Sequence, residues 1–147
     1  MTYATIILAA AKSMNISGSL LLAICTHETG LTNIVHHNDG GSPSIGICQV
    51  KYSTAKMLGF KGKENDLMNP VTNAKWAAKY LAYQIDRYGE EDWCKLTSAY
   101  NAGSYTESKI SPGMPRNLKY VRKVQKKLDI SLRDKLSCNK ELAEIGR

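Results

Sequence analysis

Hydrophobic residues recur at helical spacing along most of the chain. Near its start they fall three and four positions apart, at Ile6, Ile7, Ala10 and Ala11. This spacing places side chains on one face of a helix. The next apolar run predicts a helix over residues 17–28, with Ser17 or Ser19 as its N-cap and Gly30 just beyond its end. The chain is therefore expected to begin with two helices.

Four further helices are predicted from residues that favour helix ends. Ser53 and Asn69 are the expected caps of two of them, and Pro115 is the expected first residue of the last. Their predicted extents are a short helix over 53–59, the longest over 69–89, one with an acidic first turn over 90–103 and a basic one over 115–128.

The segment 33–43, NIVHHNDGGSP, is rich in turn-forming residues and is predicted to be a loop with a short irregular hairpin. Alternation of apolar and polar residues nowhere extends beyond a few positions. The predicted class is mainly α, with a short irregular β or loop segment near residues 33–50. Since 147 residues fit one domain, we expect a single domain over 1–147, with a core over about 1–130 and a basic tail over 131–147.

The charge of the chain is strongly positive. Twenty Lys and Arg against 13 Asp and Glu give a net charge of +7, which favours an anionic partner such as nucleic acid, an acidic membrane or a cell-wall polymer. Hydrophobic residues make up 43% of the chain, which is typical of a globular protein. The N-terminal segment lacks a basic start and an unbroken apolar run, so it predicts neither a signal peptide nor a membrane span.

The cysteines and histidines show no ligand-like spacing. The four cysteines are far apart and form no CxxC pair: Cys25, Cys48, Cys94 and Cys138. This pattern is not typical of a disulfide scaffold, and Cys25 and Cys48 are interpreted as small buried apolar residues. No cluster of ligands accompanies the histidines, so we expect no cofactor and no metal site at His27, His36 or His37.

One glutamate stands out from the helical pattern. Glu28 lies in the last turn of the predicted second helix, with Ile24, Cys25 and Leu31 around it. The C-terminal end of a helix carries partial negative charge and these neighbours are apolar, so both effects are expected to raise the pKa of the carboxyl group. A raised pKa suits a general acid that holds its proton near neutral pH. The alternative is a solvent-exposed carboxylate at a fraying helix end.

Three further strings accompany HETGL, the segment that contains Glu28: SIGICQV over 44–50, AYNAG over 99–103 and YVRKV over 120–124. In this order and at these separations they make the chain resemble the soluble lytic transglycosylase family, lysozyme-like enzymes that cleave peptidoglycan. The helix NPVTNAKWAAKYL is also similar to the family's pattern, so the resemblance extends from Leu20 to Val124. It implies a lysozyme-like fold.

The resemblance also implies roles for individual residues. It makes Glu28 the catalytic acid and places Tyr120 close to it as a substrate-binding residue. The other substrate-binding positions that it implies form the wall beside the acid and the floor of the sugar groove: Ser44, Gln49, Tyr100 and Asn101. Thr29 stands where the family usually has serine and Cys48 where it usually has methionine. Both changes conserve shape, so the implied roles are kept.

The reaction implied by the resemblance is cleavage of the β-1,4 bond between N-acetylmuramic acid and N-acetylglucosamine without water. Glu28 would act as acid and then as base, which leaves a 1,6-anhydro end. One alternative is a hydrolytic, goose-type muramidase in which Asp39 positions a water, although an aspartate in the turn NDGG is more typical of a turn former. The others are an inactive wall-binding module and a basic nucleic-acid binder, for which no recognisable motif is present.

We expect peptidoglycan glycan strands as the partner of a monomer, with no nucleic acid and no membrane anchor. The basic residues late in the chain suit an anionic polymer or form a solvated face: Arg116, Lys119, Arg122, Lys123, Lys126, Lys127, Arg133 and Lys135. Since no signal peptide is predicted, action on the wall in the periplasm implies delivery by a phage virion, a phage lysis system or a specialised secretion apparatus.

Overall fold

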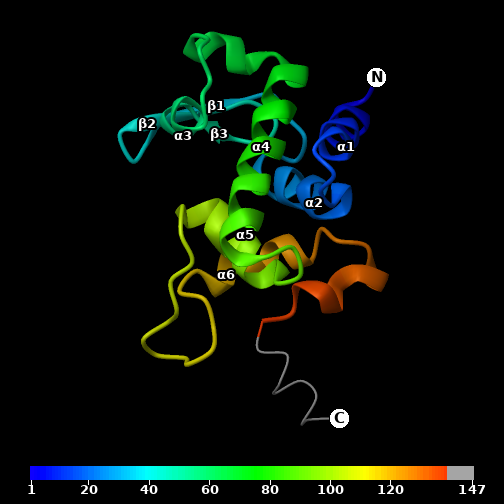
Figure 1. The fold of residues 1–147 in the computed structure, drawn as a ribbon, viewed down its shortest axis with the longest axis vertical. Helices are drawn as coiled ribbons and strands as arrows, with labels where there is room; N and C mark the ends of the chain where they lie inside the picture. Colours follow the sequence, from blue (N-terminus) through cyan, green and yellow to red (C-terminus); the bar gives the residue numbers. More distant parts are fainter. Residues whose placement is uncertain (139–147) are drawn as a thin grey trace. The chain divides into compact units, whose positions relative to one another are not determined.

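The computed structural model describes residues 1–138, apart from the side chains of Asn38 and Asp39. The chain forms two compact units, residues 1–83 and residues from Gln84 onward. The elements, in order, are α1 (Tyr3–Ser13), α2 (Gly18–Thr29), β1 (Val35–Asp39), β2 (Ser42–Ile45), β3 (Val50–Lys51), α3 (Tyr52–Met57), the 3-10 helix η1 (Glu64–Met68), α4 (Pro70–Tyr88), α5 (Trp93–Ala102), α6 (Leu118–Gln125) and the 3-10 helix η2 (Ile130–Leu136) (Figure 1). The mainly helical class predicted from the sequence is confirmed.

The first unit packs helices and a small sheet around one apolar core. Figure 1 shows α1 beside α2, and α3 against the sheet at β2. The sheet is antiparallel, in the order β1-β2-β3. Its core side chains are buried almost completely, among them Ile7, Leu20, Leu21, Ile24, Ile47 and Leu67. Their burial from water stabilises the unit, at about 25 cal/mol for each Å² of apolar surface removed.

Several predicted helix ends are confirmed because they depend on local chemistry. The Ser17 hydroxyl accepts a hydrogen bond from the Leu20 amide at 3.2 Å, and α2 ends where Gly30 takes a φ of 63°. Asn69 Oδ1 accepts from the Val71 amide at 3.0 Å, just before Pro70 opens α4. Each cap occupies a backbone group that the helix itself leaves unpaired.

The predicted start of α3 is wrong by a short distance. Lys51, not Ser53, is the N-cap of α3, and no side chain closes this end of the helix. The Ser53 amide donates to the Ser42 hydroxyl at 3.0 Å, so Ser53 lies inside the first turn and ties it to β2. The hairpin before it is irregular, as expected, with a register shift between His36 and Asp39.

In the second unit, α5 and α6 pack against each other and against η2. Asp92 caps α5, because its carboxylate accepts from the Lys95 amide at 3.0 Å. The basic helix is shorter than predicted. Pro115 pairs with Glu107 in an isolated β-bridge, so α6 begins only at Leu118. Its buried face contributes Val121 and Val124 to the core of this unit.

The interpretation of the cysteines is corrected by the structure. Cys25 and Cys48 are buried as expected, but they form a disulfide with a Cα–Cα distance of 4.3 Å. Cys94 and Cys138 form a second disulfide in the other unit. The partners lie 23 and 44 positions apart in sequence. Such long-range pairing leaves no spacing signal in the sequence.

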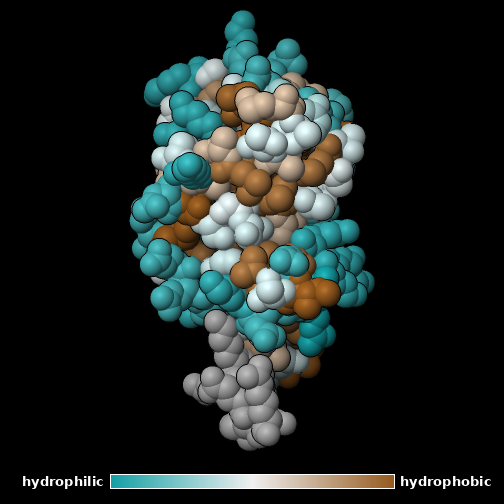
Figure 2. Space-filling view, turned by 90° about the vertical axis from the view of Figure 1, so that its right-hand side faces the viewer, coloured by the Kyte–Doolittle hydropathy of each residue, from teal (hydrophilic) through white to brown (hydrophobic). Residues whose placement is uncertain are grey.

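The surface shown in Figure 2 intersperses hydrophilic and apolar side chains. The exposed large hydrophobic residues are scattered along the sequence: Met1, Leu8, Met57, Val71, Ile110 and Ile130. Single exposed apolar residues of this kind are ordinary on a protein surface. In the described part of the chain, no helix combines the length and apolar character that crossing a bilayer requires.

Candidate active site

Glu28 lies in the last turn of α2 and is half-buried. The turn is preceded by buried residues, with Ile24 and Cys25 both fully inaccessible to solvent. Gly30 ends the helix in a left-handed conformation and donates its amide to the Thr26 carbonyl at 2.7 Å. The position predicted from the sequence is confirmed: a carboxyl group at the negative end of a helix, next to apolar packing.

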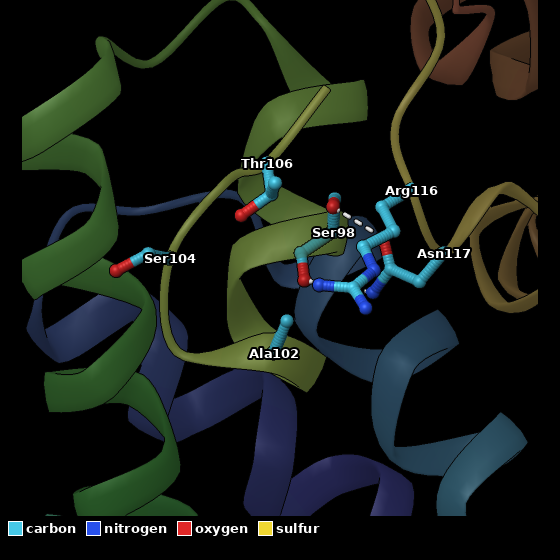
Figure 3. A pocket seen from close by; sticks show the side chains of 6 residues that line it. All are labelled: Ser98, Ala102, Ser104, Thr106, Arg116 and Asn117. Atoms are coloured by element: carbon cyan, nitrogen blue, oxygen red, sulfur yellow. Dashed lines mark hydrogen bonds between the residues drawn. The ribbon is translucent and has the colours of Figure 1, made fainter. Parts of the chain in front are cut away.

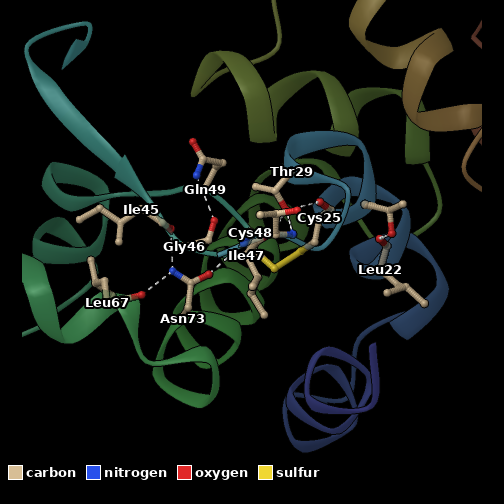
Figure 4. Close-up of a disulfide and its surroundings, with 12 residues drawn as sticks. Leu22, Cys25, Thr29, Ile45, Gly46, Ile47, Cys48, Gln49, Leu67 and Asn73 are labelled. Carbon is tan, nitrogen blue, oxygen red and sulfur yellow. Dashed lines mark hydrogen bonds between the residues drawn. A yellow bond between two sulfur atoms is a disulfide. The ribbon is translucent and has the colours of Figure 1, made fainter. Parts of the chain in front are cut away.

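Two ties hold this turn to the segment 46–49, which follows β2 (Figure 4). The Cys25–Cys48 disulfide joins the two covalently, three residues before Glu28. The Thr29 hydroxyl, one residue after Glu28, donates to the Ile47 carbonyl at 2.8 Å. The same hydroxyl accepts from the Thr32 amide at 3.1 Å. Glu28 therefore stands on a turn fixed on both sides.

The segment 46–49 is itself held by Asn73, a fully buried residue of α4. Asn73 Nδ2 donates to the carbonyls of Ile45 at 2.7 Å and Leu67 at 2.9 Å, and Oδ1 accepts from the Cys48 amide at 3.0 Å. Figure 4 shows this side-chain amide between Leu67 on one side and the segment from Ile45 to Cys48 on the other. The site thus depends on a residue that the sequence analysis missed, because a single asparagine in a helix carries no signal of its long-range partners.

Gly46 is needed for this arrangement. Its φ is +81°, and a Cβ added there would overlap the Asn73 side chain, with Asn73 Cγ only 2.6 Å away and the Leu67 carbonyl oxygen 3.0 Å away. Only glycine combines that backbone conformation with so close a neighbour. The absent side chain at residue 46 therefore makes room for the amide of Asn73.

Gln49 adopts a φ of +52°, which is uncommon for a residue with a side chain. Its Nε2 donates to the carbonyls of Ile34 at 3.1 Å and Gly46 at 3.0 Å. Its Oε1 lies 2.6 Å from His36 Nδ1, which must donate because an amide oxygen only accepts. Strained backbone is concentrated at functional sites in proteins. His36, for which no role was predicted, thus lies against a predicted substrate-binding residue.

The first unit therefore carries three of the predicted site residues: Glu28, Ser44 and Gln49. Ser44, on β2, is 3% exposed and Gln49 is 9% exposed. The substrate-binding roles expected of Ser44 and Gln49 stay predictions. Asp39, the carboxylate of the hydrolytic alternative, has a side chain that lies outside the described part of the structure.

The second unit carries the other three: Tyr100, Asn101 and Tyr120. Tyr100 is buried near the end of α5, Asn101 is exposed, and Tyr120 is half-buried on α6. Asn117 Nδ2 donates to Asn101 Oδ1 at 2.9 Å and to the Ser98 carbonyl at 3.1 Å. Asn117 Oδ1 accepts from the Ser98 hydroxyl, and the Asn117 side chain does not cap α6. The roles expected of the three residues stay predictions.

The turn after Asn101 is held from α4. Gln84, fully buried, donates through Nε2 to the Gly103 carbonyl at 3.0 Å. Arg87 Nη1 donates to the same carbonyl at 2.7 Å. Neither residue was predicted from the sequence, because their partners lie 16 to 19 positions away. Within residues 1–138, leaving aside the two side chains not described, no group of three His, Cys, Asp or Glu is placed to hold a metal ion.

Comparison with known proteins identifies the family. The family model described as the transglycosylase SLT domain matches residues 5–112. The fold is similar to that of the 70 kDa soluble lytic transglycosylase of Escherichia coli, with a TM-score of 0.56 and 21% identity over 90% of this chain and 20% of that one. It is also similar to an inactive mutant of the lytic transglycosylase Slt of Pseudomonas aeruginosa, with a TM-score of 0.60 and 16% identity over 90% of this chain and 22% of that one.

The chain thus spans about a fifth of the length of these two structures. At such identities, the similarity shows that the fold is shared, which confirms the lysozyme-like fold that the sequence implied. The family model covers well over half of the chain, including the HETGL, SIGICQV and AYNAG strings. The chain belongs to the transglycosylase SLT domain family.

Proposed function

We propose that this protein is a peptidoglycan lytic transglycosylase in which Glu28 is the catalytic acid and base. Its substrate is the β-1,4 bond between N-acetylmuramic acid and N-acetylglucosamine. The observation that carries the proposal is the position of Glu28: a half-buried carboxyl in the last turn of α2, flanked by the Cys25–Cys48 disulfide and the Thr29–Ile47 hydrogen bond. General acid–base catalysis needs a carboxyl group held in this way.

The reaction needs one carboxyl group used twice. Glu28 gives its proton to the glycosidic oxygen as the bond from that oxygen to C1 of N-acetylmuramic acid breaks. The 6-hydroxyl of the same sugar then bonds to C1 and returns its proton to Glu28. No water is consumed, and the product has a 1,6-anhydro end. Since the attacking hydroxyl is tethered to the reacting sugar, proximity takes the place of a water positioned by a second carboxylate.

The bacterial cell wall is the proposed place of action. The two disulfides support it, since disulfides persist in oxidising compartments such as the periplasm and are rare in the cytosol. Delivery by a phage virion, a phage lysis system or a secretion apparatus is part of the same proposal. Thiol labelling of protein recovered from periplasm and from cytosol tests it: we expect blocked cysteines in the first and reactive ones in the second.

Replacing Glu28 tests the proposed chemistry. The variant Glu28→Gln keeps the shape of the side chain but neither donates nor accepts the catalytic proton. We expect a loss of wall-clearing activity of about a hundredfold to ten-thousandfold in a turbidity assay on purified sacculi. Glu91→Gln, a matched change at an exposed residue before α5, should keep wild-type activity. Activity of Glu28→Gln within a few-fold of wild type would show that another group is the acid.

A further inference from the structure

A cavity of about 420 Å³ lies in the second unit, whereas Glu28 and its turn belong to the first. Its walls come from α5, the segment that follows it and the residues just before α6 (Figure 3). The lining residues are Ser98, Ala102, Ser104, Thr106, Arg116 and Asn117. A volume of this size falls within the range of small-ligand sites. Five of the six lining residues carry a polar side chain, and Ala102 is the sixth.

Arg116 is the charged group of this lining. Its backbone is fixed, because its amide donates to the Thr106 carbonyl at 2.8 Å. In the part of the chain that the structure describes, the guanidinium has no hydrogen-bond acceptor and no acidic partner. Figure 3 shows the side chain extended toward α5, on the side of Ser98 and Ala102. A guanidinium group that has no partner and stands on a fixed backbone is suited to binding an oxyanion through two parallel hydrogen bonds.

The hydroxyl groups around Arg116 supply further donors. Ser104 Oγ accepts from Arg87 Nη2 at 2.8 Å, which leaves its own proton for a ligand. Thr106 adds a second, exposed hydroxyl. The nearby carboxylate of Glu107 accepts from the Gly113 amide at 3.0 Å. Burial raises the pKa of Tyr105, and the charges of Glu107 and Asp92 raise it further.

One side chain of the cavity also contacts Asn101. Asn117 lines the cavity and also donates to Asn101 Oδ1 at 2.9 Å. Asn101 is the residue expected on the floor of the groove. A group bound beside Arg116 would therefore belong to the same polymer as the sugars, close to the glycan but not part of it. In peptidoglycan, the acidic groups beside the glycan are the carboxylates of its attached peptide.

We propose that this cavity binds a carboxylate of the peptide attached to the glycan, with Arg116 as its cationic partner. The inference rests on the proposed function, because it assumes peptidoglycan as the substrate. It assigns Arg116, Ser104 and Thr106 to substrate binding and gives them no part in bond cleavage. A polymer of phosphodiesters is the less suitable ligand, since it presents charge along an extended chain and the cavity holds a single unpaired cation among its lining residues.

Binding by Glu28→Gln protein, which does not cleave its ligand, tests the proposal. The probes for isothermal titration are a disaccharide-tetrapeptide fragment of peptidoglycan and the same fragment with its carboxyl groups converted to amides. Adding Arg116→Gln should weaken binding of the acidic fragment about tenfold, the worth of a charge-assisted hydrogen bond. It should leave the amidated fragment unchanged. Arg122→Gln, the same change at an exposed residue of α6, should leave the affinity for both fragments unchanged.

Three outcomes would overturn the inference. Equal weakening of both fragments by Arg116→Gln would make Arg116 a structural residue. An unchanged affinity for both fragments would show that the bound fragment does not contact Arg116. A loss confined to a third probe, a glycerol phosphate oligomer, would assign the cavity to a phosphate polymer instead. If the parent Glu28→Gln protein binds neither peptidoglycan fragment, the proposed function fails together with the cavity proposal. If it binds both fragments and Arg116→Gln has no effect, only the cavity proposal fails.

Discussion

The two turns that carry the predicted site are held by different means. In the first unit, the turn of Glu28 is joined to residues 46–49 by a disulfide and by the Thr29–Ile47 bond. The three hydrogen bonds of Asn73 in turn hold that segment. In the second unit, the turn after Asn101 is held by the hydrogen bonds of Gln84, Arg87 and Asn117 alone. The disulfide of that unit starts at Cys94, near the other end of α5.

This difference follows the chemistry proposed for each turn. Proton transfer needs a carboxyl group within about 2.6–3.2 Å of its partner, and a displacement of 1 Å can cost about a hundredfold in rate. A surface that binds sugar tolerates more movement, because water can bridge small gaps. A covalent tie is thus found at the turn proposed to carry the chemistry. Hydrogen bonds alone hold the turn proposed to bind sugar.

Removal of the two disulfides, one at a time, should give the largest difference between the two turns. Each closes a loop of tens of residues, so each pair of Cys→Ser changes should lower the free energy of unfolding by about 3–4 kcal/mol in a denaturant titration. Only Cys25→Ser with Cys48→Ser should also lower kcat, by about tenfold, with KM little changed. Cys94→Ser with Cys138→Ser is the matched control. An equal loss of kcat in both pairs would reduce the first disulfide to a general stabiliser.

Asn73→Ala should produce a slightly smaller effect. It leaves two carbonyls and one amide unpaired in a buried place, at a cost of about 3 kcal/mol in stability. Chemical denaturation measures this loss, and Asn65→Ala at an exposed position of η1 serves as control. A loss below about 0.5 kcal/mol would show that water replaces the amide and that Asn73 does not hold the segment 46–49.

Features with local causes were predictable from the sequence, and those with distant partners were not. Ser17, Gly30 and Asn69 mark helix ends because their bonds lie within four residues. The Cys25–Cys48 pairing and the partners of Asn73 and Gln84 depend on contacts 6 to 28 positions away. The predicted start of the basic helix failed for the same reason, since residues before α6 pair with the loop that follows α5.

The basic face of the chain should give a smaller effect. Lys123, on α6, and Lys126 and Lys127, just after it, are exposed, opposite the buried Val121 and Val124. Changing the three lysines to Gln should weaken cosedimentation with sacculi at low salt by a few-fold. The difference should fade as salt rises, because exposed charges are screened beyond about 8 Å at physiological ionic strength. Equal binding at every salt concentration would make these lysines ordinary solvated surface.

If Glu28 is the one carboxyl group used in the reaction, the mass of the product will show it. Wall digested by wild-type protein and by Asp39→Asn should give muropeptides lighter by one water than those of a hydrolytic muramidase, and at similar rates. In that case the attacking group is the sugar's own 6-hydroxyl. Products with a full reducing end, together with an inactive Asp39→Asn variant, would contradict the account and show a hydrolase that uses two carboxylates.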